Sequence, residues 1–270
     1  MHPVLFEFDT PNFLRGFFPD TIGIYTYGFL IACGASLGYL FTRYQAKKQF
    51  NASTEVVQTM VIIIIAAAVV GGKLFIFFED PERYWNDPLA IFRNFSTGFV
   101  FYGSLLLAIP SLLLYVKASK IPALPMLDII AITACIVHGF GRLGCFMAGC
   151  CYGLPHEGWT SVTFTHPRSS AEPLFTPLHP TQLYDAFSIF TIMAILLFLS
   201  KRKQFHGQIF LVYLMLYAIG RSVIEIFRGD VERGFIIENV LSNSQLISGL
   251  LFLTALFFYV RLRKSATAAP

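Results

Sequence analysis

Seven apolar stretches of about 20 residues each, the length of a helix that crosses about 30 Å of hydrocarbon, constrain this chain most strongly. They lie at 21–42, 56–78, 97–116, 125–146, 180–200, 207–228 and 243–260. Inside lipid, only helices and closed barrels satisfy every backbone hydrogen-bonding group. The sequence therefore predicts an all-α polytopic membrane protein with seven transmembrane helices.

The composition supports this fold class. The 270 residues are 55% hydrophobic and only 13% charged, whereas a soluble domain carries about 25% charged residues. The apolar stretches use up most of the length, so we expect a single membrane domain over residues 1–270. The first twenty residues lack a basic segment, which argues against a cleavable signal peptide. We expect them to form an exposed, partly interfacial lead-in to the first helix.

The charges alternate between successive connections. The connections after the first, third, fifth and seventh stretches hold eleven of the 20 basic residues and one acid, Glu55. The other connections and the N-terminus are acidic. By the positive-inside rule, the N-terminus lies outside and the C-terminus lies in the cytoplasm. The longest outer connection, about 147–179, is rich in proline, and we expect it to form a small periplasmic cap.

Seven ionisable side chains remain at membrane depth, where each costs about 2.5–3.5 kcal/mol at a helix centre. We expect them to face a cavity or one another; they are Lys73, Asp128, Arg142, Asp185, Arg221, Glu225 and Arg228. Arg221 and Glu225 are four residues apart and can pair on one helix face. Either they form a structural ion pair, or Glu225 orients Arg221 toward an anionic ligand. Lys73 and Arg228 are interpreted as reaching the outer interface, and Asp128 as interfacial.

Polar and helix-breaking residues are densest at 138–153, which holds one arginine, three cysteines, one histidine and five glycines. The glycines around Arg142 are expected to unwind the helix end and to let a ligand approach. A guanidinium suits bidentate phosphate binding. Because Arg142 and Arg221 both lie near the outer ends of their stretches, together they indicate a phospholipid headgroup. For His138, packing with a hydrogen bond to a carbonyl is favoured over a role as base.

Cys145, Cys150 and Cys151 admit three interpretations. They pack a tight loop, form a redox-active disulfide, or bind a metal ion. Packing is favoured over a disulfide, and a metal comes last, because adjacent cysteines rarely give tetrahedral geometry and no CxxC pair is present. At 179–184, HPTQLY either lines the mouth of a cavity or caps a helix.

Six motifs together resemble the prolipoprotein diacylglyceryl transferase family. They are Tyr27-Gly28, Gly71-Gly72-Lys73, Tyr102-Gly103, GRLGCFMAGCCYG at 141–153, HPTQLYD at 179–185 and GRSVIEIFRGD at 220–230. The resemblance implies an enzyme of the bacterial inner membrane with its active site toward the periplasm. Such an enzyme moves the diacylglyceryl group of phosphatidylglycerol to the lipobox cysteine of a prolipoprotein, without metal or organic cofactor. Glycerol 1-phosphate is released.

The same resemblance assigns roles to residues. Arg142 and Arg221 hold the lipid phosphate, Glu225 braces Arg221, Gly153 closes the signature loop and Tyr27 lines the lipid cavity. Tyr102 joins the catalytic group, and Cys145 and His179 join the substrate-binding group.

The chain departs from the family's usual pattern at three positions. Cys145 replaces an asparagine, Cys150 a glutamate, and Tyr102 a frequent histidine. The proton acceptor is therefore open among Tyr102, His138 and His179, and Cys145 is a further candidate as a thiolate beside Arg142. Two alternatives of other classes are a membrane thiol oxidoreductase using Cys150 and Cys151, and a lipid transporter. The absence of an inverted repeat argues against the transporter.

Overall fold

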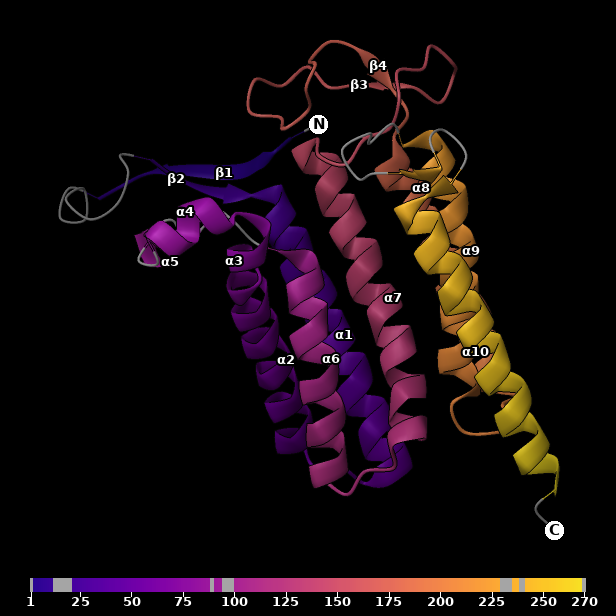
Figure 1. Ribbon diagram of the computed structural model, residues 1–270. Helices are drawn as coiled ribbons and strands as arrows, with labels where there is room; N and C mark the ends of the chain where they lie inside the picture. The colour runs from indigo at the N-terminus through magenta and orange to yellow at the C-terminus, as the bar shows by residue number, and fades with distance from the viewer. Residues whose placement is uncertain are drawn as a thin grey trace. The chain divides into compact units, whose positions relative to one another are not determined.

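The computed structural model of the chain describes residues 2–11, 21–87, 90–93, 100–228, 235–237 and 241–268 (Figure 1). It divides into two compact units, which are described separately. The first unit contains Met1–Phe41 and Leu127–Pro270, and the second contains Thr42–Met126. Two helices belong to both units: α1 (Thr26–Phe50) begins in the first, and α7 (Ala123–Ala148) begins in the second.

In its described residues, the first unit combines long helices with three small antiparallel sheets. Its further helices are α8 (Thr181–Ser200), α9 (Gln208–Phe227) and α10 (Asn243–Ala268). The sheets pair β1 (Val4–Asp9) with β2 (Thr21–Tyr25), β3 (Val162–Thr163) with β4 (Pro177–Leu178), and β5 (Phe235–Ile237) with β6 (Leu241–Ser242). The β3–β4 pair lies in the connection between α7 and α8, beyond the ends of these helices (Figure 1).

A buried apolar cluster joins three helices of this unit. Cys135 of α7 meets Ile189 and Leu196 of α8 and Ile209 of α9, and none of these side chains is more than 1% exposed. A second cluster packs α10 on α9 through Ala255 and Leu211. These contacts hold α7, α8 and α9 together, so that polar residues near their ends are brought close to one another.

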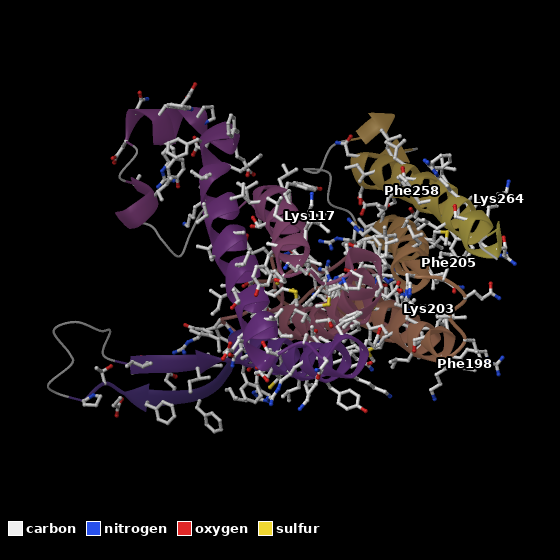
Figure 2. The ribbon with its side chains drawn as sticks, turned by 90° about the horizontal axis from the view of Figure 1, so that it is seen from below. Lys117, Phe198, Lys203, Phe205, Phe258 and Lys264 are labelled. Carbon is white, nitrogen blue, oxygen red and sulfur yellow. The ribbon has the colours of Figure 1, made fainter. Side chains whose placement is uncertain are left out.

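Asp128 has a structural role at the start of α9, and its expected position at the membrane interface remains a prediction. Its carboxylate is buried and accepts hydrogen bonds from the backbone N–H groups of Gly207 and Phe210, both at 2.9 Å. It therefore caps the start of α9, where an anion is stabilised by the unpaired N–H groups of the first turn. Lys203 Nζ lies 3.2 Å from the same carboxylate. Figure 2 shows Lys203 and Lys264 at this end of the unit, which is seen there from below.

The second unit is built on the packing of α2 (Thr54–Leu74) against α6 (Phe101–Ala118). Gly71 and Gly103 face each other, and a Cβ atom on either would overlap the backbone oxygen of the other. Ser104 Oγ also donates to Ala68 O at 2.9 Å. The short helices of this unit are α3 (Ile76–Glu79), α4 (Pro81–Asn86) and α5 (Ala90–Arg93). Two of the quoted sequence motifs thus serve helix packing here.

The helices agree with a polytopic membrane protein. Among the described residues, five helical segments are long and apolar enough to cross a membrane: Thr54–Glu79, Ala123–Ala148, Thr181–Ser200, Gln208–Phe227 and Asn243–Thr267. The apolar segment of α6, Tyr102–Ala118, is shorter. The expected first span at 21–42 corresponds to α1, which begins at Thr26 because residues Thr21–Tyr25 pair with β1 as a strand. The expected third span began at 97, and residues 97–99 lie outside the described part of the chain.

Candidate active site

The helix that carries Arg142 is continuous. We expected the glycines around Arg142 to unwind it, and this expectation is wrong: α7 remains helical through Gly139, Gly141 and Gly144 to Ala148. Gly144 instead provides room for Tyr27 of α1, since a Cβ atom on Gly144 would lie 3.0 Å from Tyr27 Cδ2. The helix ends at Gly149, whose φ of +80° favours glycine. Gly144 therefore serves helix packing, as does Gly139 against Phe190, and Gly149 serves helix termination.

Arg142 is held by two side chains. Its Nε lies 2.7 Å from Asp185 Oδ2 on α8 and donates to His138 Nε2 at 3.1 Å, one turn back on α7. The Asp185 side chain is only 6% exposed. Both of these contacts are made through Nε and not through the two Nη groups. The fork of the guanidinium is therefore fixed at one edge and available at the other, as bidentate binding of an oxyanion requires.

Asp185 is the residue that the sequence analysis missed as a partner of Arg142. It was recognised as an ionisable residue at membrane depth and as the last residue of the HPTQLYD motif. Charge complementarity could have revealed this pair. A buried carboxylate needs a nearby cation, and Arg142 had no acidic partner assigned to it. His138 also differs from its expected contact, since it accepts from Arg142 and not through a carbonyl.

Arg221 and Glu225 form the predicted ion pair on α9. Nη2 of Arg221 lies 2.6 Å from Glu225 Oε2, and both side chains are nearly buried. Nη1 of Arg221 is also buried, and the described residues offer it no acceptor. A buried N–H group without a partner costs about 1–3 kcal/mol. A ligand oxygen would remove this cost.

Both arginines lie near His138. Arg142, Arg221 and Asp185 all lie within electrostatic range of the His138 side chain. They come from α7, α9 and α8, whose packing was described above. The site therefore combines two guanidinium groups, each held by a carboxylate. The N–H groups that the carboxylates do not contact are Nη1 and Nη2 of Arg142 and Nη1 of Arg221. Such an arrangement matches an anion with several oxygens, such as a phosphate.

The residues of HPTQLY hold the loop after α7. Thr181 Oγ1 donates to Cys151 O at 2.8 Å, and Gln182 Nε2 donates to Cys150 O at 2.7 Å. Both side chains are 1% exposed. Of the two interpretations of this motif, lining a cavity or capping a helix, neither describes these contacts. The start of α8 instead fastens the cysteine-containing loop to the bundle.

His179 lies just before α8 and contacts Tyr184 and His156. Its Nδ1 lies 3.1 Å from Tyr184 Oη, and its ring stacks on His156 with centroids 3.9 Å apart. Partial burial and the neighbouring His156 lower the pKa of His179 below its ordinary value. The ring is therefore held mainly neutral at pH 7, with its Nδ1 engaged by Tyr184.

Gly153 lies where three segments meet. Its N–H donates to His179 O at 2.8 Å, and the next residue donates to Phe227 O at the end of α9. A Cβ atom at this position would overlap Phe227 O and lie 2.7 Å from Thr181 Cγ2. Only glycine fits this crossing, which joins the loop to the ends of α8 and α9.

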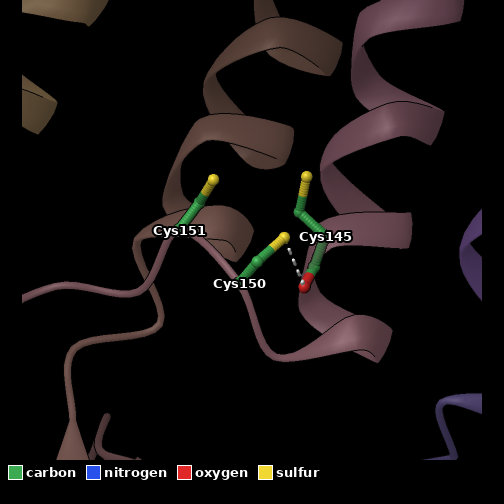
Figure 3. Close-up of side chains that lie close together, drawn as sticks. All are labelled: Cys145, Cys150 and Cys151. Carbon is green, nitrogen blue, oxygen red and sulfur yellow. Dashed lines mark hydrogen bonds between the residues drawn. The ribbon is translucent and has the colours of Figure 1, made fainter. Parts of the chain in front are cut away.

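All five cysteines are free, and three of them gather where α7 meets this loop. The Sγ atoms of Cys145, Cys150 and Cys151 lie within 4.8 Å of one another (Figure 3). Hydrogen bonds from Cys145 and Cys150, with help from the positive charges of Arg228 and Arg142, lower the pKa of Cys151. The same contacts and burial raise the pKa of Cys150. Cys151 is thus the thiol that ionises first outside the helices.

Two tyrosines of the predicted site lie in different units. Tyr27 lies in the first turn of α1 in the first unit, within electrostatic range of the three thiols and of Arg142. Tyr102 lies in the first turn of α6 in the second unit and is 64% exposed. The structure thus brings Tyr27 to the loop, whereas the part assigned to Tyr102 remains a prediction.

Fold and site together define a helical membrane protein with two carboxylate-braced arginines near its helix ends. Residues 17–261 match the sequence family described as prolipoprotein diacylglyceryl transferase. The chain is also similar to a phosphatidylglycerol–prolipoprotein diacylglyceryl transferase of Clostridium tetani, with 34% identity over 96% of this chain and 97% of the relative. A similar enzyme of Clostridium perfringens is 32% identical over 87% of this chain and 90% of the relative. One of Dehalococcoides mccartyi is 32% identical over 88% of this chain and 89% of the relative. The chain belongs to the prolipoprotein diacylglyceryl transferase family, and its members are transferases.

Proposed function

We propose that this protein transfers the diacylglyceryl group of phosphatidylglycerol to the lipobox cysteine of prolipoproteins. The observation that carries the proposal is the pair of braced arginines, Arg142 with Asp185 and Arg221 with Glu225. Their unused N–H groups match the oxygens of a phosphodiester. The similar enzymes bear the name of this reaction, and none of those named above is a redox enzyme or a transporter.

The reaction needs no nucleophile from the enzyme. The thiolate of the acceptor cysteine attacks the glycerol carbon that carries the phosphate, a C–S bond forms, and the C–O bond to the phosphate breaks. Glycerol 1-phosphate leaves with the bonding electrons, and the thiol proton passes to a base or to water. Arg142 and Arg221 stabilise the negative charge that grows on the leaving phosphate. Their fixed positions also keep the phosphate in line for attack.

The remaining roles follow from position. Tyr27 lines the lipid side of the site beside Gly144, and Gly153 keeps the loop closed on α8 and α9. Tyr102, His138 and His179 remain the candidates for accepting the proton. For His138, the position of its Nε2 beside Arg142 Nε favours a part in positioning the guanidinium.

The chain crosses the bacterial inner membrane seven times, with its N-terminus outside and its C-terminus in the cytoplasm. The charge alternation of the connections supports this topology. The two arginines then lie toward the periplasm, as does the loop from Gly149 to Pro180, which contains β3 and β4. Phosphatidylglycerol and the lipobox peptide both enter from the membrane.

The test is transfer of labelled lipid from phosphatidylglycerol vesicles to a lipobox peptide by the purified protein. Arg142→Lys keeps a cation beside the buried Asp185 but lacks the fork, and we expect at least about 100-fold slower transfer, as when one donor to a developing charge is removed. Undiminished transfer by Arg142→Lys and by Arg142→Ala contradicts the role of this arginine. Absence of transfer by the intact protein contradicts the function.

A further inference from the structure

The three thiols of the loop are positioned by its backbone. Cys145 O accepts from the N–H groups of Gly149 and Cys150, at 2.9 and 3.2 Å. Cys151 adopts a φ of +63°, which is uncommon for a residue other than glycine. The bonds from Thr181 and Gln182 to the loop carbonyls hold this conformation in place. The chain thus maintains an unusual local backbone that turns two adjacent cysteines toward a third, which lies on α7.

This geometry answers the objection that adjacent cysteines give a poor metal site. Four sulfur ligands at about 2.3 Å from a tetrahedral zinc ion are about 3.8 Å apart. The Sγ atoms of Cys145, Cys150 and Cys151 already lie within 4.8 Å of one another, so small side-chain rotations bring them to that spacing. All three are only partly buried, which leaves a path for an ion.

The charges around the three cysteines are also compatible with a group of thiolates. Three thiolates and one divalent cation carry a net charge of −1. Two positively charged side chains, Arg142 and Arg228, lie within electrostatic range of Cys151 and offset this negative charge. The packing role that the sequence favoured for these cysteines explains neither the convergence of three sulfur atoms nor the cations beside them.

We propose that Cys145, Cys150 and Cys151 form a three-thiolate site for a soft divalent metal ion, best matched by Zn²⁺, with its fourth position open. Thiolates select ions of this kind over Mg²⁺ or Ca²⁺. Three protein ligands with an open position are the pattern of zinc sites that act on a substrate.

The role of this metal site rests on the proposed function: the open position of the metal accepts the thiol of the acceptor peptide. Coordination releases the thiol proton to water and leaves a metal-bound thiolate. Its sulfur then forms the C–S bond as the C–O bond to the phosphate breaks, and the metal does not change its oxidation state. Arg142 is three residues before Cys145 on α7, on the same face, so the phosphate and the thiolate are held side by side. The site thereby takes the place of a dedicated base.

Metal binding is tested without any assay of transfer. The full-length protein, reduced and stripped of metal in detergent, is titrated with Co²⁺. We expect one equivalent to bind with sulfur-to-cobalt charge-transfer absorption, and Zn²⁺ to displace it. Cys150→Ser and Cys151→Ser should lose this absorption, whereas Cys33→Ser, a change of a free cysteine on α1, should keep it. Absence of stoichiometric binding by fully reduced protein, or thiols found only as a disulfide, overturns the site.

Binding of the peptide thiol at the open position of the metal can be measured separately. Adding a lipobox peptide to the Co²⁺ protein should strengthen the charge-transfer band, and the same peptide with serine in place of cysteine should not. Stripped protein should transfer lipid about 100-fold more slowly, comparable to loss of a general base, and Zn²⁺ should restore the rate. Full transfer by stripped protein refutes the metal's part and leaves the proposed function standing. A metal-loaded protein that binds peptide but transfers nothing refutes the proposed function instead.

Discussion

At the scale of single residues, the site depends on which nitrogen atoms of its arginines are already engaged. Asp185 and His138 contact Nε of Arg142, and Glu225 contacts Nη2 of Arg221. A free arginine side chain would lose rotamer freedom on binding a phosphate, at a cost of up to about 2 kcal/mol. Here folding has already restricted both side chains, so the ligand meets guanidinium groups that are oriented in advance.

Asp185→Asn tests this orientation. The amide keeps the size of the side chain but removes the charge that holds Arg142 Nε. A hydrogen bond to a charged group contributes about 1.5–3 kcal/mol, so we expect transfer to fall about 10- to 100-fold. The matched control is Glu7→Gln, which weakens the exposed pair between Glu7 and Arg168 in the same unit. Exposed pairs contribute about 0–1 kcal/mol, and this variant should keep nearly full activity. Equal effects of the two changes would contradict the role of Asp185.

Arg221→Lys separates charge from geometry at the second arginine. Lysine keeps a cation for Glu225 but cannot offer two parallel N–H groups to a phosphate. We expect the variant to fold and to show a rate at saturating lipid lowered about 10-fold or more, since a donor to the leaving phosphate is lost. Initial rates across a range of phosphatidylglycerol concentrations measure this. If only the apparent affinity for lipid changes, Arg221 binds the substrate without assisting the reaction.

At the scale of elements, the site is made by the meeting of helix ends and one loop. Gly153 lies between the end of α9 and the start of α8, and Thr181 and Gln182 fasten the loop that precedes it. The loop is therefore part of the helix packing, and these bonds hold the backbone of Cys150 and Cys151 in place. A change in this crossing should affect folding and site together.

Gly153→Ala tests the crossing. The added methyl group overlaps Phe227 O and crowds Thr181, and overpacking of this kind costs about 1–3 kcal/mol. We expect a lower midpoint of thermal unfolding in detergent. Gly141→Ala is the control, because a Cβ atom there meets nothing within 4 Å and alanine favours a helix by about 1 kcal/mol. Its midpoint should stay the same or rise. A lower midpoint for Gly141→Ala than for Gly153→Ala would contradict this account.

Sequence patterns predict these elements unevenly. Long apolar stretches reveal membrane helices, and the spacing of four residues reveals the pair of Arg221 with Glu225, because both signals are local. The contact of Arg142 with Asp185 and the convergence of three thiols depend on how α7, α8 and the loop pack. Local spacing carries no such information. Glycine was misjudged for the same reason: at Gly144 it admits Tyr27, which only the packed helices reveal.

At the scale of the whole molecule, the apolar surface and the charges describe the surroundings of the chain. Only 11% to 44% of the residues in the most apolar window of each spanning segment are buried within the protein. Side chains such as Leu253 and Phe257 on α10 remain more than half exposed. In water this surface would aggregate, whereas in a bilayer lipid covers it. Charge then decides which way the helices point.

The topology gives the last prediction. A fluorescent protein that matures only in the cytoplasm, fused after the C-terminus, should fluoresce, since the positive-inside rule assigns Lys264 and its basic neighbours to the inner side. A phosphatase active only in the periplasm should be active when inserted beside Trp159, which is 97% exposed in the loop between α7 and α8. Replacing Lys201, Arg202 and Lys203 by glutamine should leave both signals in place, because three other inner connections keep their basic residues. The opposite pair of signals would place Arg142 and the thiols on the cytoplasmic side. Lipobox peptides would then have to be modified before they cross the membrane, and the proposed path of the substrate would be wrong.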